Sequence, residues 1–285
     1  MILPITPKLP DLRPESFKWL IMGGSGMGKS SLFASIPKIL VIDPDNGMAA
    51  LPLDFEPLQV RNWTDCLSVL KLLKQAKPEE LLRYSWIGLD LANVMYEFAY
   101  NHECSRMGVS YPSDLEGGKA RGKGWAIITK TYISWLRELG TLGLPLIATC
   151  HVNLVEVSVK NRTFQRAIPG FPGGSATSVF QRVKESFDIV GYLTFDLVPT
   201  DAEKDQRKVL AGNVTLVDVP KHQQIEATNT RVIHFQPSQY WDAQDTSRQL
   251  PEKVILPTEW EQDWSTIQQA WRWKANESAG NNTKA

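Results

Sequence analysis

Eight consecutive residues near the start of the chain have the types and spacing that bind the phosphates of a nucleoside triphosphate. The run Gly23-Gly24-Ser25-Gly26-Met27-Gly28-Lys29-Ser30 fits the phosphate-loop (P-loop) pattern G-x-x-x-x-G-K-[ST]. Its glycines let the backbone curl so that N–H groups face phosphate oxygens. The Lys29 ammonium can reach the β- and γ-phosphates, and the Ser30 hydroxyl can ligate Mg²⁺. With Ser31, this run predicts a site for ATP and Mg²⁺.

The residues on either side decide between a P-loop and a flexible glycine turn. Lys18–Met22 runs straight into the loop as a buried strand would, and Ser30–Ala34 can open a helix. The positive N-terminal end of such a helix faces the phosphates and favours their charge. This strand–loop–helix context favours the P-loop.

A carboxylate at the end of a second apolar run can complete the metal site. Ser85–Leu89 reads as a strand, and Asp90 follows it. In P-loop proteins an Asp at this position holds Mg²⁺, usually through water; the alternative is a cap for the next helix. Leu91 rather than Glu comes next, so the group that activates water must lie elsewhere.

Two further strand ends carry polar residues that can act on the nucleotide. Asp45 closely follows the strand after the P-loop helix, where it can orient the attacking water. The alternative is a Pro-Asp-Asn-Gly turn over Pro44–Gly47. His151 follows the apolar run Leu144–Cys150 and can sense the γ-phosphate, or it can be purely structural.

Apolar runs alternate with helical stretches along the chain, which predicts a mainly parallel sheet flanked by helices. The expected strands are Lys18–Met22, Ile39–Ile42, Leu58–Val60, Trp86–Leu89, Pro145–Thr149 and Ile189–Leu193. The expected helices are Lys29–Ala34, Trp63–Gln75, Asn93–Tyr100, Trp125–Leu139 and Ser175–Lys184. Two long stretches, Asn101–Gly124 and Asn153–Gly174, are expected to be loops, and loops of this length are commonly functional or disordered.

The composition excludes several classes of protein. The 285 residues include 31 basic and 31 acidic side chains, so a strongly basic nucleic-acid binder is excluded and only a local basic patch stays open. The three cysteines form no C-x-x-C pair, which argues against structural zinc or a disulfide framework and favours a cytoplasmic setting. No apolar run approaches the ~18 residues of a membrane span, so no membrane partner is expected.

The order of these parts resembles the RecA-like recombinase fold, in particular the small RecA-like ATPases of bacteriophages that include single-strand annealing proteins. The resemblance covers about residues 18–193. It rests on the P-loop, the strand end Ile42–Asp45, Asp90 without a following Glu, His151 at a strand tip, and the two long loops. Asp45 stands where RecA has Glu, which is one methylene longer, so turnover is expected to be slow. His151 stands where RecA has Gln.

The resemblance implies that the two long loops bind single-stranded DNA. The basic side chains would contact phosphates and the two phenylalanines would stack on bases. These residues are Lys119, Arg121, Lys123, Lys160, Arg162, Phe164, Arg166 and Phe171. The alternative is that the charges are solvated and the phenylalanine rings pack on the domain.

The sequence therefore predicts an α/β protein with a RecA-like P-loop core over residues 16–198. An extended arm (1–15), a small C-terminal strand and helix extension (199–275) and a flexible tail (276–285) complete the chain. The expected function is a DNA-stimulated ATPase of phage-type recombination or annealing. It would form a ring or filament in the cytoplasm of an infected bacterium, with a single-strand DNA-binding protein as a further partner. A nucleotide-gated scaffold and a small-molecule kinase remain alternatives.

Overall fold

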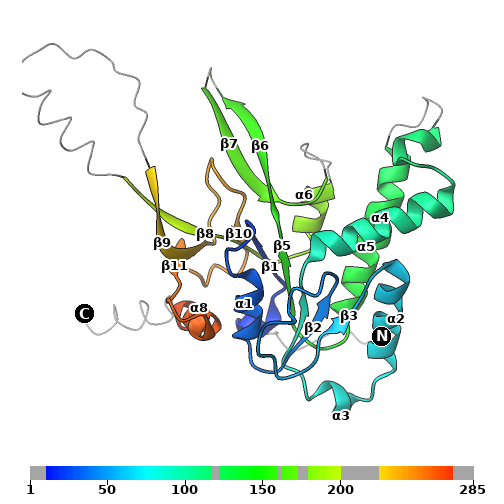
Figure 1. Cartoon of the computed structure of the whole chain (residues 1–285), viewed down its shortest axis with the longest axis horizontal. Coiled ribbons are helices and arrows are strands. Elements are labelled where there is room, and N and C mark those ends of the chain that lie inside the picture. The colour runs from blue at the N-terminus through cyan, green and yellow to red at the C-terminus, as the bar shows by residue number, and fades with distance from the viewer. Residues whose placement is uncertain (1–10, 117–121, 160–161, 173–178, 200–224, 272–285) are drawn as a thin grey trace, which may run out of the picture.

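A single twisted sheet with helices on both faces forms the centre of the molecule (Figure 1). A computed structural model describes residues 11–116, 122–159, 162–172, 179–199 and 225–271. Within these residues the sheet has nine strands: eight follow the order β11-β9-β8-β1-β5-β4-β2-β3, and the ninth, β10, pairs with β8. The first strand along the chain, β1, lies in the middle of the sheet and leads directly into the predicted P-loop.

The middle of the sheet is parallel, as the alternation of apolar runs and helices predicted. Its strands are β1 (Trp19–Gly23), β2 (Ile39–Asp43), β3 (Leu58–Gln59), β4 (Trp86–Leu89), β5 (Leu146–Cys150) and the first half of β8 (Ile189–Pro199). Every residue of β1, β2, β4 and β5 is buried, because helices cover both faces. The carboxyl ends of these strands therefore meet at one edge, where open α/β sheets bind ligands.

The helices divide the core into two halves. One half lies under α2 (Trp63–Gln75), α4 (Ala92–Met107), α5 (Lys123–Leu139) and α6 (Val179–Lys184). The other half lies under α1 (Lys29–Ala34) and α8 (Asp263–Trp271). The remaining short helices are α3 (Pro78–Leu81), η1 (Pro14–Ser16), η2 (Pro112–Glu116) and η3 (Trp260–Gln262).

The segment after residue 224 extends the central sheet instead of standing apart from it. β9 (Ile225–His234) pairs antiparallel with β8, and β11 (Lys253–Ile255) pairs with β9. The short β10 (Gln244–Asp245) pairs with the start of β8. The predicted C-terminal strands and helix are thus present, and they share the core of the P-loop.

Both stretches that were expected to be loops contain regular structure. Within Asn153–Gly174 the chain forms a hairpin of β6 (Val152–Val159) and β7 (Arg162–Pro169), which projects beyond the sheet (Figure 1). Its alternation of polar and apolar residues is the strand period that the sequence interpretation missed. Within Asn101–Gly124, α4 continues to Met107 and η2 follows. The C-terminal tail and most of the N-terminal arm lie outside the described residues.

Tryptophan side chains join α8 to the sheet. The ring of Trp19 on β1 lies 5.6 Å from that of Trp264 and 5.5 Å from that of Trp271, measured between centroids. Trp264 also meets Trp86 on β4 edge-on at 5.2 Å. These three contacts come from fully or almost fully buried rings, so α8 is part of the core that holds the P-loop helix.

We predict that Trp264→Ala lowers the free energy of unfolding by about 3–5 kcal/mol, the usual cost of removing a buried aromatic side chain. Trp260→Ala is the matched control, because that indole is only half-buried and should cost clearly less. Urea unfolding followed by circular dichroism measures both. Equal losses for the two variants would show that α8 does not share the core.

Candidate functional site

The predicted P-loop lies between β1 and α1, as its pattern requires. Gly26 and Gly28 have φ angles of +75° and +88°, which L-residues with side chains rarely adopt. Gly23 faces another constraint, since a Cβ on it would lie 2.9 Å from the carbonyl oxygen of Leu193. The glycines therefore fix both the turn of the loop and its close approach to β8.

The Lys29 ammonium is hydrogen-bonded to the backbone of the P-loop itself. Its Nζ donates hydrogen bonds to the carbonyl oxygens of Gly23 at 2.9 Å and Gly24 at 2.7 Å. Burial lowers the pKa of Lys29, while the negative charge of Asp90 acts against this shift. The side chain is thus a desolvated cation tethered to the loop, which suits it to an anionic phosphate.

Asp90 lies one residue beyond β4 and is hydrogen-bonded on both carboxylate oxygens. Oδ2 accepts from the Ser30 hydroxyl at 2.7 Å, and Oδ1 accepts from the Thr149 hydroxyl at the end of β5. Burial raises the pKa of Asp90, and the bonds from Thr149 and Ser30 oppose that shift. Leu91, not Asp90, is the N-cap of α4, so the helix-cap alternative is excluded.

The adjacent hydroxyl and carboxylate suit Mg²⁺, which usually takes one or two protein oxygens and completes its shell with phosphates and water. Ser30 and Asp90 would hold the ion, and ATP would supply the other oxygens together with solvent. The described part of the chain contains no cluster of three or more His, Cys, Asp or Glu side chains that could hold a metal alone. A metal site that depends on bound nucleotide fits this set of donors.

Asp43 is a site residue to which the sequence interpretation gave no role. Its buried carboxylate accepts backbone N–H bonds from Asp45, Gly47 and Met48 at 3.1–3.2 Å, and one from the Gln59 amide at 3.1 Å. The turn after β2 is therefore real, and Asp43 holds it together. A carboxylate that directly ends an apolar strand and precedes Pro-Asp-Asn-Gly was the available signal.

That turn exposes Asp45 at the same edge of the sheet as the P-loop. The side chain reaches solvent, but partial desolvation of its carboxylate is the largest cause that raises the pKa of Asp45, and the neighbouring Asp43 adds to it. Asp45 acts electrostatically on the Lys29 ammonium, so the two side chains share one region. A carboxylate with a raised pKa near the phosphate-binding cation is suited to orient water or accept a proton.

His151 stands directly between β5 and the hairpin. Its backbone N–H donates to the Asn93 side-chain oxygen at 3.1 Å, and its carbonyl accepts from Gly170 N at 2.7 Å. Burial lowers the pKa of His151, and Lys29 lowers it further, which favours a neutral imidazole. The nucleotide-site candidates Lys29, Asp45, Asp90 and His151 thus lie at one edge of the sheet.

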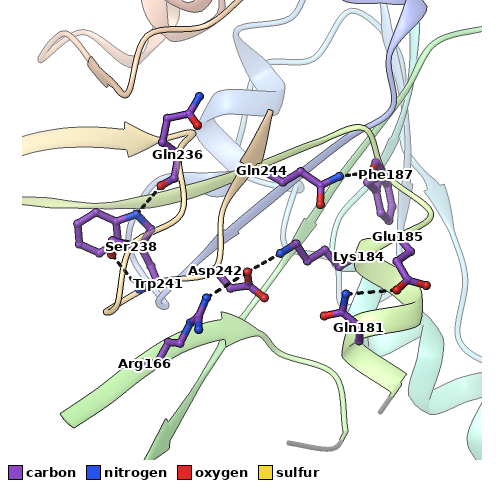
Figure 2. A network of polar contacts seen from close by, with 10 residues as sticks. All are labelled: Arg166, Gln181, Lys184, Glu185, Phe187, Gln236, Ser238, Trp241, Asp242 and Gln244. Atoms are coloured by element: carbon purple, nitrogen blue, oxygen red, sulfur yellow. Dashed lines mark hydrogen bonds and ion pairs between the residues drawn. The ribbon is translucent and has the colours of Figure 1, made fainter. Parts of the chain in front are cut away.

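The predicted DNA contacts are more scattered. Lys119, Arg121 and Lys160 lie outside the described residues, Arg162 begins β7, and Lys123 begins α5. The guanidinium of Arg166 lies 3.5 Å from Asp242, which also accepts from Lys184 (Figure 2). Arg166 therefore anchors the base of the hairpin in this structure.

For one of the two phenylalanines, Phe171, the prediction of base stacking is wrong. Phe171 is fully buried, and its ring centroid lies 6.0 Å from that of Tyr96 and 6.1 Å from that of Tyr132. It belongs to the core, because the chain turns inward after β7. Phe164 is half-buried on the hairpin, 5.8 Å from the ring of Tyr240, which is 50% exposed.

A family model described as an AAA domain matches residues 15–247. The chain belongs to the AAA domain family. The match covers the P-loop, Asp45, Asp90, His151 and the hairpin, and the family consists of nucleotide-binding ATPases. No curated protein matches the chain. In the described part of this AAA domain, no helix combines the length and apolarity needed to cross a bilayer.

We predict that Lys29→Ala weakens ATP binding by this AAA domain about 100-fold or more, because the variant loses the cation paired with the phosphates. Lys71→Ala on the exposed side of α2 is the matched control. Titration of a fluorescent ATP analogue, with circular dichroism to confirm folding, measures the effect. Unchanged affinity in a folded Lys29 variant would contradict the assignment of the nucleotide site.

For Asp45→Asn we expect ATP turnover to fall at least ~10²-fold, as when a positioned base is lost, while ATP affinity stays within a few-fold. The amide keeps the size of the side chain and leaves the Asp43 bonds to the turn in place. Single-turnover hydrolysis provides the measurement. Normal turnover would mean that Asp45 serves only the turn.

Proposed function

We propose that this AAA domain is a RecA-like ATPase of the bacteriophage type, which binds ATP–Mg²⁺ and single-stranded DNA and acts in recombination or strand annealing. The observation that carries the proposal is the continuity between the nucleotide edge and the hairpin. β5 ends at Cys150, His151 follows, and β6 begins at Val152. The residue that we propose as the phosphate sensor thus immediately precedes a projecting element.

His151 is connected to both strands of the hairpin. Val152 pairs with Pro169 at the base of the hairpin, and Gly170 N donates to the His151 carbonyl at 2.7 Å. A Cβ on Gly170 would lie 2.6 Å from that carbonyl oxygen, so the two segments are in close contact. A shift of His151 on binding or loss of the γ-phosphate would therefore move the hairpin, which would couple ATP to the DNA surface.

The base of the hairpin is held against the segment that connects β9 to β10. Ala167 N donates to the Tyr240 carbonyl at 2.7 Å, and Asp242 N donates to the Ala167 carbonyl at 2.9 Å. Figure 2 shows Arg166 of β7 and Lys184 of α6 both directed at Asp242. Because these contacts fix the base of the hairpin, a shift of His151 would tilt the free end of the hairpin about that base.

The free part of the hairpin carries groups suited to a single strand. Phe164 and Tyr240 form an aromatic pair at its side, and Leu154 is 60% exposed. Stacking of a base on an aromatic side chain contributes ~1–3 kcal/mol regardless of sequence. Arg162 at the start of β7 and Lys123 at the start of α5 would supply phosphate contacts, together with Lys119, Arg121 and Lys160, which lie outside the described residues.

Within this proposal Asp45 positions the attacking water and His151 senses the γ-phosphate. The chain would assemble into a ring or filament around or along DNA and would work beside a single-strand DNA-binding protein in the cytoplasm of an infected bacterium. The shorter reach of Asp45 relative to a Glu supports slow hydrolysis, which suits a protein whose bound state must outlast strand pairing.

We predict that replacing Lys119, Arg121 and Lys123 together by Ala weakens binding of single-stranded DNA and reduces its salt dependence. Each phosphate contact on a single strand contributes about −0.7 to the slope of log K against log salt, so losing three contacts should change the slope by roughly 2. Fluorescence anisotropy of a labelled oligonucleotide with ATP and Mg²⁺ present provides the measurement.

Phe164→Ala separates stacking from charge in the same assay. It should weaken DNA binding with an unchanged salt slope, because stacking releases no counterions. Phe55→Ala is the matched control, since Phe55 forms a similar aromatic pair with Tyr84 away from the hairpin. If the unsubstituted protein binds no DNA with ATP present, the proposal fails and a nucleotide-gated scaffold becomes the better interpretation.

A further inference from the structure

Arg231 of β9 lies directly against the P-loop of its own chain. Its Nη1 atom is 2.7 Å from the position that a Cβ on Gly28 would occupy. The sheet explains this approach: Arg231 pairs with Phe195 on β8, two residues beyond Leu193, which pairs with Gly23 at the start of the loop. A guanidinium thus lies beside the loop that is built to receive an anion.

Asp263 fixes the orientation of this guanidinium. Nη1 and Nη2 of Arg231 donate to the two carboxylate oxygens of Asp263 at 2.7 and 2.8 Å, and Nη2 also donates to the Pro257 carbonyl at 3.0 Å. The Asp263 side chain is 0% exposed and that of Arg231 only 13%. A two-pronged buried ion pair of this kind holds a planar group in a single position.

The same end of α8 also contacts the other end of the P-loop helix. Trp264 N donates to Ser35 Oγ at 3.0 Å, and Ser35 is the residue that ends α1. Asp263 and Trp264 therefore connect α8 with both ends of α1, through Arg231 at Gly28 and directly at Ser35. Arg231 is held in place from α8 while it contacts the loop.

Stability alone does not account for a charged pair at this place. Desolvation of two buried charges offsets most of their attraction, so apolar residues of similar volume usually hold a core equally well. What the ion pair adds is a fixed dipole in a low-dielectric position: its positive end, the Arg231 guanidinium, lies nearest the phosphate loop, and Asp263 lies behind it. Lys29 is the corresponding cation inside the loop.

We propose that Arg231, oriented by Asp263, is a positioning residue of the nucleotide site: it supports the P-loop at Gly28 and strengthens binding of the phosphate chain. This inference rests on nucleotide binding by the AAA domain. It adds to that function a residue from beyond the P-loop core, supplied by the same chain. It also links α8 to the bound state of the loop.

Two double variants of the full chain test the proposal. R231M/D263L removes both charges at similar volume, so that no unpaired charge is left buried. R231D/D263R keeps an ion pair but places the negative partner nearer the loop. K253M/D196L is the matched control, because Lys253 of β11 and Asp196 of β8 form an ion pair on the same side of the sheet order, with Nζ 3.0 Å from both carboxylate oxygens.

Calorimetric titration with ADP and with ATP in the presence of Mg²⁺ measures affinity, and thermal unfolding measures stability. We expect R231M/D263L to lose about tenfold in affinity for both nucleotides and R231D/D263R to lose more, because the potential at the loop falls in that order. The losses should shrink at high salt, and the control should bind as the unsubstituted chain does.

Several outcomes would overturn the inference. If both variants bind ADP and ATP like the unsubstituted chain, the pair is structural only. Equal losses in the two variants, or losses that follow thermal stability and not charge, would also assign it to the fold. If the unsubstituted chain itself binds neither nucleotide, nucleotide binding fails together with this inference. That result is distinct from normal binding in the variants.

Discussion

Hydrogen bonding to the buried carboxylate of Asp90 is the interaction that holds together the edge of the sheet at which the P-loop lies. A carboxylate that is 1% exposed needs partners, and it finds them in hydroxyl groups from two other elements, Ser30 of α1 and Thr149 of β5. These bonds connect α1, the end of β4 and β5 to one another at the site. Ser30 and Asp90, which we propose as the Mg²⁺ ligands, are thus already adjacent to each other.

The site has two different flanks because β1 lies between β5 and β8 in the sheet. On the β5 side, His151 connects the sheet to the hairpin, so a shift of this residue would change the position of the hairpin. On the β8 side, β9 carries Arg231 to the loop, and α8 is fastened behind it. A nucleotide in the P-loop would therefore act on two segments that are far apart in sequence.

The local parts of this arrangement were readable from sequence, and the long-range parts were not. The P-loop and the apolar strands depend on neighbouring residues, so α1 and α2 begin and end where the pattern placed them. The hairpin was missed because its basic and glycine-rich surroundings suggested a loop. Phe171 was misread because its burial depends on Tyr96 and Tyr132. Arg231 was expected in a strand but was given no role at the P-loop, because that role depends on a partner 32 residues later in the chain.

The tryptophan contacts of α8 have a consequence for the order of events during synthesis. The P-loop helix is synthesised long before Trp264 and Trp271, yet these two tryptophans belong to the core that it covers. Contacts between segments so far apart in sequence slow folding, since the two segments must meet before their shared core is stable. Until then the strand carrying Trp19 presents an apolar surface, so the nascent chain is open to aggregation over the long interval between synthesis of Trp19 and synthesis of Trp264.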